Sequence, residues 1–213
     1  MPQRITILQK LRLVIFGISL EAALQDPRWQ VPARDLDVAE IFTTAQSVVL
    51  AGGAAGYRAE GYDLGLPGCA SATTEAGFHQ ILRLVMRLRV GGLLCVAPCC
   101  KSFVFAPRRW TCRSAANVVG DTSRPMVRDG NLMANIAMFI YSLAILRGAE
   151  ALLENPSGSM IFRSGPLRVF CATFWRWFEN AYHSKEPFVE DTFQKGPRHY
   201  CFNLHLNIHI PSS

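Results

Sequence analysis

The sequence predicts an α/β domain built on a mostly parallel sheet with helices on both faces, in three layers. Two observations predict this class. Short apolar runs bounded by Gly and Pro recur along the chain, as expected of strands that are buried on both faces. Segments with helical spacing of apolar residues alternate with these runs, and parallel strands need such helical crossovers. We therefore expect one domain over residues 34–170, a helix and linker over 1–33, and a poorly patterned extension over 171–213.

The composition is that of a folded enzyme or binding domain. The chain has 213 residues, of which 50% are apolar and 18% are charged, and this composition excludes disorder over the whole chain. Its formal net charge of +6 permits a polyanionic partner such as nucleic acid. A mildly basic enzyme without such a partner is an equally good interpretation.

The cysteines favour an intracellular, reducing compartment, either the nucleus or the cytoplasm. There are seven of them at irregular spacings, and an odd count does not suit a disulfide scaffold. A zinc site that joins Cys112 to Cys95, Cys99 or Cys100 is disfavoured, because the sequence has no Cys-x-x-Cys pair. We predict no metal site.

The N-terminal segment is expected to form a helix that is amphipathic or docks on the core. Its apolar run over 13–20 follows basic residues but has no small-residue cleavage pattern, although a transit segment is the alternative. The run is far too short to cross a bilayer, and we expect no membrane partner. Pro27 and Pro32 bracket the linker that follows.

In the first half of the domain we expect a strand over 37–42, a helix over 45–51, a strand over 58–63, and a helix from Thr73 or Thr74. Thr43 or Thr44 would cap the first of these helices. The second helix carries an apolar stripe at helical spacing over 78–88.

In the second half we expect a strand over 93–97, a helix over 131–146 and a strand over 149–153. The polar stretch 98–127 has no regular periodicity, and loops of that length are usually functional or mobile. Near the C-terminus, residues 174–178 could finish a helix, and 201–210 alternates like a half-exposed strand. His205 and His209 would share its polar face, where a solvated edge is favoured over a metal pair.

Candidate functional residues follow the predicted strands. Ligands of open α/β sheets bind at the carboxyl ends of the strands. Four such ends carry polar or reactive groups: Glu40 and Thr43, Asp63, segment 98–103, and segment 154–156. A carboxylate such as Asp63 can accept both hydroxyls of a ribose, and starting the turn before Gly65 is an equally good role for it.

Three of these segments resemble the C5-cytosine DNA methyltransferases. Segment 98–103, Pro-Cys-Cys-Lys-Ser-Phe, resembles their Pro-Pro-Cys-Gln-x-Phe loop, and Glu-Asn-Pro at 154–156 resembles their Glu-Asn-Val segment. Ala-Glu-Ile-Phe-Thr-Thr at 39–44 resembles their Asp-x-Phe-x-Gly-x-Gly strand and loop. The order and rough spacing agree over about 37–160. The resemblance implies a Rossmann-like fold, S-adenosylmethionine as cofactor and nucleic acid as substrate.

The resemblance also implies a role for each matching residue. Cys100 corresponds to the nucleophile that attacks C6 of a flipped cytosine, so that C5 can accept a methyl group. Glu154 corresponds to the carboxylate that contacts the ring N3 and exocyclic amine. Asp63 would hold the ribose, and the other residues expected at the cofactor are Glu40, Phe42, Thr43 and Pro98. The basic residues of the long loop that could meet phosphates are Lys101, Arg108, Arg109 and Arg113.

The chain also departs from this family. Thr43 and Thr44 stand where glycines would let a cofactor approach, Lys101 replaces the Gln after the cysteine, and no Gln-x-Arg-x-Arg segment follows Glu154. The alternative is therefore an inactive Rossmann-like domain that binds nucleic acid or protein. A cysteine hydrolase is less well supported, because no histidine lies in a recognisable frame with Cys100. Cys100 could also be a structural thiol, and Glu154 a helix cap.

Overall fold

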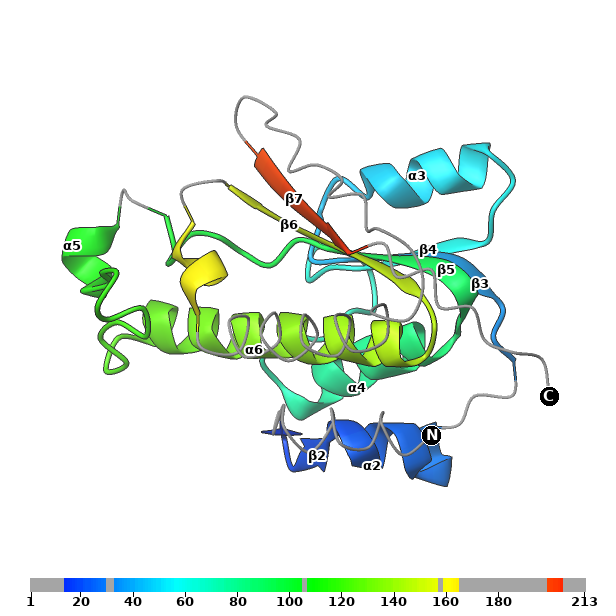
Figure 1. Cartoon of the computed structure of the whole chain (residues 1–213), viewed down its shortest axis with the longest axis horizontal. Coiled ribbons are helices and arrows are strands. Elements are labelled where there is room, and N and C mark those ends of the chain that lie inside the picture. The colour runs from blue at the N-terminus through cyan, green and yellow to red at the C-terminus, as the bar shows by residue number, and fades with distance from the viewer. Residues whose placement is uncertain (1–13, 30–32, 105–106, 157–158, 165–198, 205–213) are drawn as a thin grey trace, which may run out of the picture. The chain divides into compact units, whose positions relative to one another are not determined.

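The structure is a computed structural model that describes residues 14–29, 33–104, 107–156, 159–164 and 199–204 (Figure 1). The chain divides into two compact units, each made of separate segments. The sheet unit comprises Asp26–Pro98, Ile140–Glu154 and Phe202–Ser213, and the loop unit comprises Met1–Gln25, Cys99–Phe139 and Asn155–Cys201. The sequence places one domain boundary near 34 and another near 170, whereas these two units interleave along the chain.

The α/β class is confirmed by a parallel sheet. Its four parallel strands are β3 (Leu36–Ile41), β4 (Ala59–Tyr62), β5 (Leu88–Val96) and β6 (Glu150–Pro156). They lie in the order β4-β3-β5-β6, and β7 (His199–Leu204) continues the order beside β6. The order is not sequential, because the chain leaves β3 for β4 on one side and then returns to form β5 on the other side.

Two helices pack on this sheet, and both were expected from the sequence. Helix α3 (Ser47–Ala54) packs against β3 and β4, and α4 (Glu75–Met86) packs against β3 and β5. The apolar stripe of α4 is buried, and Thr74 caps the helix by accepting the Gly77 N–H at 3.2 Å. For α3 the cap prediction is wrong, since the N-cap residue is Gln46 rather than Thr43 or Thr44.

Strand β5 begins earlier than expected because the Gly91-Gly92 pair lies within it. Leu36 pairs with Leu88 and Val38 pairs with Leu93, so β5 carries extra residues between these pairs. Gly91 has φ 73°, a backbone conformation that glycine adopts without a side-chain clash. The glycine pair therefore forms an irregularity inside the strand.

Helix α6 (Pro125–Leu146) also begins earlier than the expected residue 131. Pro125 is its first residue, a position where a missing backbone N–H costs nothing. By length and composition this helix could cross a membrane, and 67% of its apolar window is buried inside the structure. Core helices of proteins in water meet the same criterion, so this finding decides neither for nor against a membrane.

The N-terminal helix predicted over 13–20 is wrong for the described part of that segment. Val14–Ile15 (β1) and Ile18–Ser19 (β2) pair as an antiparallel hairpin, and the helix α2 begins only at Leu20 and ends at Gln25. Phe16 and Gly17, which join the strands, both have positive φ, as the common two-residue hairpin turn requires. A short 3₁₀ helix, η1 (Pro27–Trp29), occupies the start of the expected linker.

The long polar stretch after β5 belongs to the loop unit and holds the short helix α5 (Arg108–Thr111). A second short helix, η2 (Met160–Arg163), packs with Phe103 and Ala134 in the core of this unit. The expected helix end at 174–178, as well as His205 and His209, lie outside the described residues.

Candidate functional site

The register of the sheet aligns the carboxyl ends of its four parallel strands. Ile41 on β3 pairs with Tyr62 on β4 and with Val96 on β5. Val96 in turn pairs with Leu153 on β6. These four residues form one row across the sheet unit, and the backbone continues past it, since the Phe42 N–H donates to the Tyr62 carbonyl at 2.8 Å.

The residues that follow this row form the edge row, which we define as Asp63, Phe42, Ala97 and Glu154. Adjacent strands of a sheet are about 4.8 Å apart, so that about 10 Å separates the backbones of Phe42 and Glu154. Three predicted site residues therefore share the edge row, and Pro98, a fourth, comes directly after it. The edge row lies where the strand order reverses between β3 and β5, which is where open α/β sheets bind ligands.

The loop after β3 has two residues in the left-handed region. Phe42 has φ 71° and Gln46 has φ 49°, although neither is glycine. Such backbone conformations cost about 1–3 kcal/mol each and gather at functional sites. The Gln46 side chain lies against Gly61 of β4, where an added Cβ would come within 1.3 Å of the Gln46 Oε1. This loop thus adopts backbone conformations that glycine usually occupies, and the Gln46 side chain fills the space beside Gly61.

Glu40 is 2% exposed, and its carboxylate caps α3 from the neighbouring strand. Its Oε2 accepts the backbone N–H groups of Val48 and Val49, both at 2.9 Å. Gln46, the N-cap residue, makes no such bond with its side chain. Glu40, which the sequence predicted to lie at the cofactor, therefore has a structural role as the cap of α3.

Asp63 makes the turn contact that was one of its two expected roles. Its Oδ1 accepts the Gly65 N–H at 2.9 Å and the Thr44 hydroxyl at 3.3 Å. This bond to Thr44 joins the loops after β3 and β4. Next to it, burial raises the pKa of Tyr62 to about 12, so its hydroxyl stays protonated and donates to the Ala70 carbonyl. The ribose role of Asp63 stays a prediction.

In the loop unit, the predicted nucleophile lies at the start of a tight turn, which we call the thiol loop (residues 99–104). The Cys100 carbonyl accepts the N–H groups of Phe103 at 2.8 Å and of Val104 at 3.1 Å. Cys100 is partly buried, Cys99 and Lys101 are exposed, and neither cysteine forms a disulfide. Phe103 is buried, and its carbonyl accepts the Met160 N–H at 2.8 Å. The second half of the thiol loop is therefore anchored in the loop unit through Phe103.

Arg113 holds this turn and does not fit the predicted contact with phosphates. It is 3% exposed, and its guanidinium lies 3.9 Å from the centre of the Phe103 ring. It donates to the Ser102 hydroxyl at 3.1 Å and to the Asn131 side chain at 2.9 Å. Further donations reach the carbonyls of three valines: Val118, Val119 and Val127. Burial lowers the pKa of Arg113 to about 10, and among the described residues no carboxylate pairs with it.

The remaining basic residues of the thiol loop and α5 are more accessible. Lys101 and Arg109 are exposed, and Arg108 is partly buried with its Nη2 3.5 Å from the Met160 sulfur. Trp110 follows Arg109 in α5, and its side chain is 68% exposed. Trp110 is not among the site residues predicted from the sequence, and the signal that identifies it is an aromatic residue directly after two arginines.

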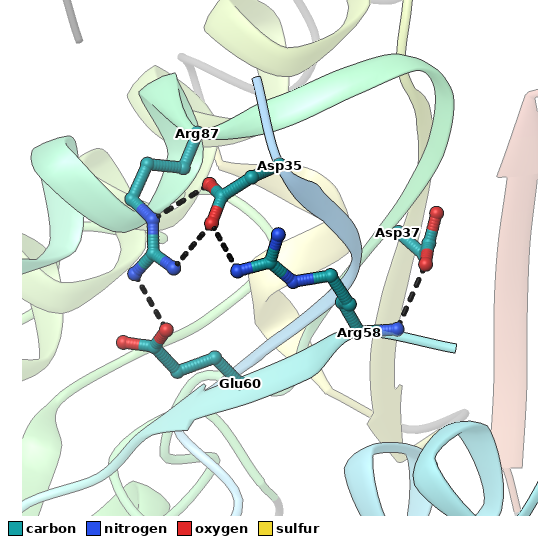
Figure 2. A network of polar contacts seen from close by, with 5 residues as sticks. All are labelled: Asp35, Asp37, Arg58, Glu60 and Arg87. Atoms are coloured by element: carbon teal, nitrogen blue, oxygen red, sulfur yellow. Dashed lines mark hydrogen bonds and ion pairs between the residues drawn. The ribbon is translucent and has the colours of Figure 1, made fainter. Parts of the chain in front are cut away.

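A second polar cluster lies at the opposite, amino ends of the strands. Arg87 contacts Asp35 through Nε and Nη2, both at 3.0 Å, and contacts Glu60 at 2.5 Å. Arg58 contacts Asp35 at 2.7 Å and donates its backbone N–H to Asp37 (Figure 2). These residues precede or begin β3, β4 and β5, so we regard this amino-end network as a structural tie rather than a site.

Within the described ranges, no group of three or more His, Cys, Asp and Glu residues could hold a metal ion. Comparison with family models, with curated proteins and with solved structures found no match for this chain.

Proposed function

We propose that the protein is a divergent S-adenosylmethionine-dependent methyltransferase of the Rossmann-like, three-layer type, acting on a nucleobase. The edge row carries this proposal, because it gathers Asp63, Phe42 and Glu154 at the reversal of strand order. The three-layer arrangement is supported by Figure 1, where α3 and α4 lie on opposite sides of the strands of the sheet unit.

The cap on α3 favours a cofactor without phosphate groups at this position. Dinucleotide cofactors place a pyrophosphate on the free N–H groups at a helix N-terminus. Here Glu40 already accepts two of those N–H groups, and its negative charge repels phosphate. S-adenosylmethionine has no phosphate and carries a positively charged sulfonium, so nearby carboxylates favour its binding. The carboxylate cap on α3 therefore supports the cofactor that the resemblance implies.

The resemblance implies the chemistry, with Cys100 as the nucleophile and Glu154 as the ring-binding group. S-adenosylmethionine supplies an electrophilic methyl group. Cys100 belongs to the loop unit, and its role as nucleophile is the one that the resemblance implies. A Cys100 thiolate adds to C6 of a pyrimidine, which makes C5 nucleophilic while the Glu154 carboxyl group binds the ring. After methylation, loss of the C5 proton to a base expels the thiolate and restores the ring.

A binding domain without catalysis is the second candidate, and one observation favours it. Gln46 stands in the loop that would border the cofactor, and its side chain lies against Gly61. Bulk at this place restricts the close approach that glycines permit.

Isothermal titration of the full chain with S-adenosylmethionine tests the proposal. We expect saturable binding that Asp63→Ala weakens about fivefold or more, by the loss of a charged hydrogen bond. Asp129→Ala, at an exposed position of α6, is the matched control and should bind as the wild type does. The absence of a heat of binding at millimolar S-adenosylmethionine would refute the methyltransferase proposal. Binding without methyl transfer to any cytosine-containing polynucleotide would favour the second candidate, and transfer by Cys100→Ser would remove the thiol from the mechanism.

A further inference from the structure

We infer that the surface around Trp110 in the loop unit binds single-stranded nucleic acid by stacking a base on the indole. This inference deepens the proposed function, on which it rests only for the link between binding and methyl transfer. It names the polymer that would be held, and its test involves neither the cofactor nor Cys100.

Trp110 is an exposed aromatic residue on an anchored helix, α5. Its side chain is 68% exposed, whereas Thr111 beside it is fully buried. The Thr111 carbonyl accepts the Asp121 N–H at 2.8 Å, which ties α5 to the turn that precedes α6. Gly120 has φ 72°, and a Cβ there would lie 2.6 Å from the Thr111 oxygen, so this close contact needs glycine. The indole is therefore presented by a well-anchored helix, which lowers the entropy cost of stacking.

Two arginines accompany the indole, one near its ring in space and one beside it in the sequence. The Arg124 guanidinium lies 6.0 Å from the centre of the Trp110 ring, and Asp121 fixes it through a 2.9 Å contact to Nε. Among the described residues Asp121 is its only ion-pair partner, which leaves the two Nη groups for a phosphate. Arg109 precedes Trp110 directly and is exposed. Arginines around an exposed aromatic residue are what binding to single strands uses, with cations on the phosphates and a ring under the base.

The distribution of charge agrees with a polyanionic partner for this unit in particular. Residues 99–139 contain six Lys and Arg residues and two acidic residues, whereas residues 33–98 contain five Lys and Arg and six acidic residues. One of the six cations is the buried Arg113, and the others lie on the surface or are partly buried. The positive charge of the chain is therefore concentrated in the unit that carries Trp110.

A single strand fits this surface better than a duplex does. The faces of the bases in a duplex are covered by their neighbours in the stack, and an exposed indole can stack only on a base that is already unpaired or is turned out. The charge excess also disfavours a second copy of the chain, because two such surfaces would repel each other.

Fluorescence anisotropy of a labelled short oligothymidylate, titrated with the full chain, tests the inference. We expect Trp110→Ala to weaken binding by about 5- to 100-fold and Trp110→Phe by much less, since a phenyl ring still stacks. Val119→Ala, at another exposed apolar position of the loop unit, is the control and should leave the affinity unchanged. For Arg109→Ala, the slope of log affinity against log salt should fall by about 1.

Three results would overturn the inference. One is an affinity of Trp110→Ala within twofold of the wild type, with both proteins equally stable to urea. Another is tighter binding of a duplex of equal length than of the single strand. The third is a wild-type dimer that Trp110→Ala converts to a monomer without loss of DNA affinity, which would make this surface a contact between copies. None of these results depends on binding of S-adenosylmethionine, so the methyltransferase proposal can fail or stand separately.

Discussion

At the scale of single residues, Arg113 decides how the thiol loop is held. Burying an arginine without a carboxylate is costly, and the cost is offset here because carbonyl, hydroxyl and amide oxygens surround the guanidinium. The planar guanidinium also stacks on Phe103. One side chain thus joins the thiol loop, the turn around Val119 and the first turns of α6, so a residue predicted for the surface is instead central to the loop unit.

Gly130 of α6 supplies the space that this arrangement needs. It therefore predicts the direction in which a Gly→Ala substitution changes the free energy of unfolding. Gly→Ala inside a helix normally stabilises a protein by about 0.5–1 kcal/mol. At Gly130 a Cβ would lie 2.1 Å from the Ser102 Oγ. We therefore expect Gly130→Ala to lower the free energy of unfolding by about 1–3 kcal/mol, because the thiol loop must move away from Arg113.

The matched control is Gly53 of α3, where an added Cβ meets nothing within 4 Å. Gly53→Ala should raise the free energy of unfolding by about 0.5 kcal/mol or more. Urea denaturation at one pH measures both variants. Equal effects of the two substitutions would contradict the proposed packing of Ser102 on Gly130.

At the scale of helices and strands, the sequence could predict most elements of the sheet unit because their signals are local. The strands over 36–41 and 150–156 and the helix α4 follow from short apolar runs and from an apolar stripe with a capping threonine. The hairpin over 14–19 could not be predicted in this way, because its apolar residues fit a helix equally well. In the structure, strand pairing and the positive φ of Phe16 and Gly17 identify the hairpin, and the apolar pattern of the sequence encodes neither.

The candidate site could be predicted in part for the same physical reason. Residues at the ends of parallel strands must share one edge, so Asp63, Phe42 and Glu154 could be grouped from the sequence alone. The role of Glu40 could not be predicted, because it depends on a hydrogen bond between its side chain on β3 and the backbone of α3. The burial of Arg113 likewise depends on acceptors 5 to 18 residues further along the chain.

The amino-end network gives a prediction about pH at this scale, because it ties together the starts of β3, β4 and β5. Arg87, by its hydrogen bond and charge, holds the pKa of Asp35 below its ordinary value of 3.8. A carboxyl group with a lowered pKa stabilises the fold fully above the ordinary value, and this contribution is lost as the pH falls through the folded-state pKa. We expect the wild type to lose stability below about pH 4 and Asp35→Asn to lose less over that range.

Urea midpoints of the two proteins between neutral pH and pH 3 measure this difference. Asp129→Asn is the control, because Asp129 is exposed and has no ion pair among the described residues. Its acid-side loss of stability should match that of the wild type. If Asp35→Asn and wild type lose stability in parallel, the network does not contribute to acid sensitivity.

At the scale of the whole molecule, the chain passes between the two units several times, and α6 takes part in both. Local patterns predict elements but carry no information on which segments return to the same unit. A single domain over 34–170 was therefore the simplest prediction from the sequence. Along α6, the first turns carry the polar residues of the loop unit, and residues 136–146 are buried on every side of the helix.

A helix that is apolar all round belongs to a core or to a membrane, and a substitution separates these two environments. We propose that α6 is a core helix. Ala144 is fully buried, so Ala144→Leu should lower the free energy of unfolding by about 1–3 kcal/mol through overpacking. The same change at the exposed Ala76 of α4 should stay within about 0.5 kcal/mol. Phase separation in a cloud-point detergent measures the partitioning of the wild type, which we expect in the aqueous phase. Recovery in the detergent phase, together with full tolerance of Ala144→Leu, would instead assign α6 to a lipid environment, where a larger apolar side chain meets no packed neighbour.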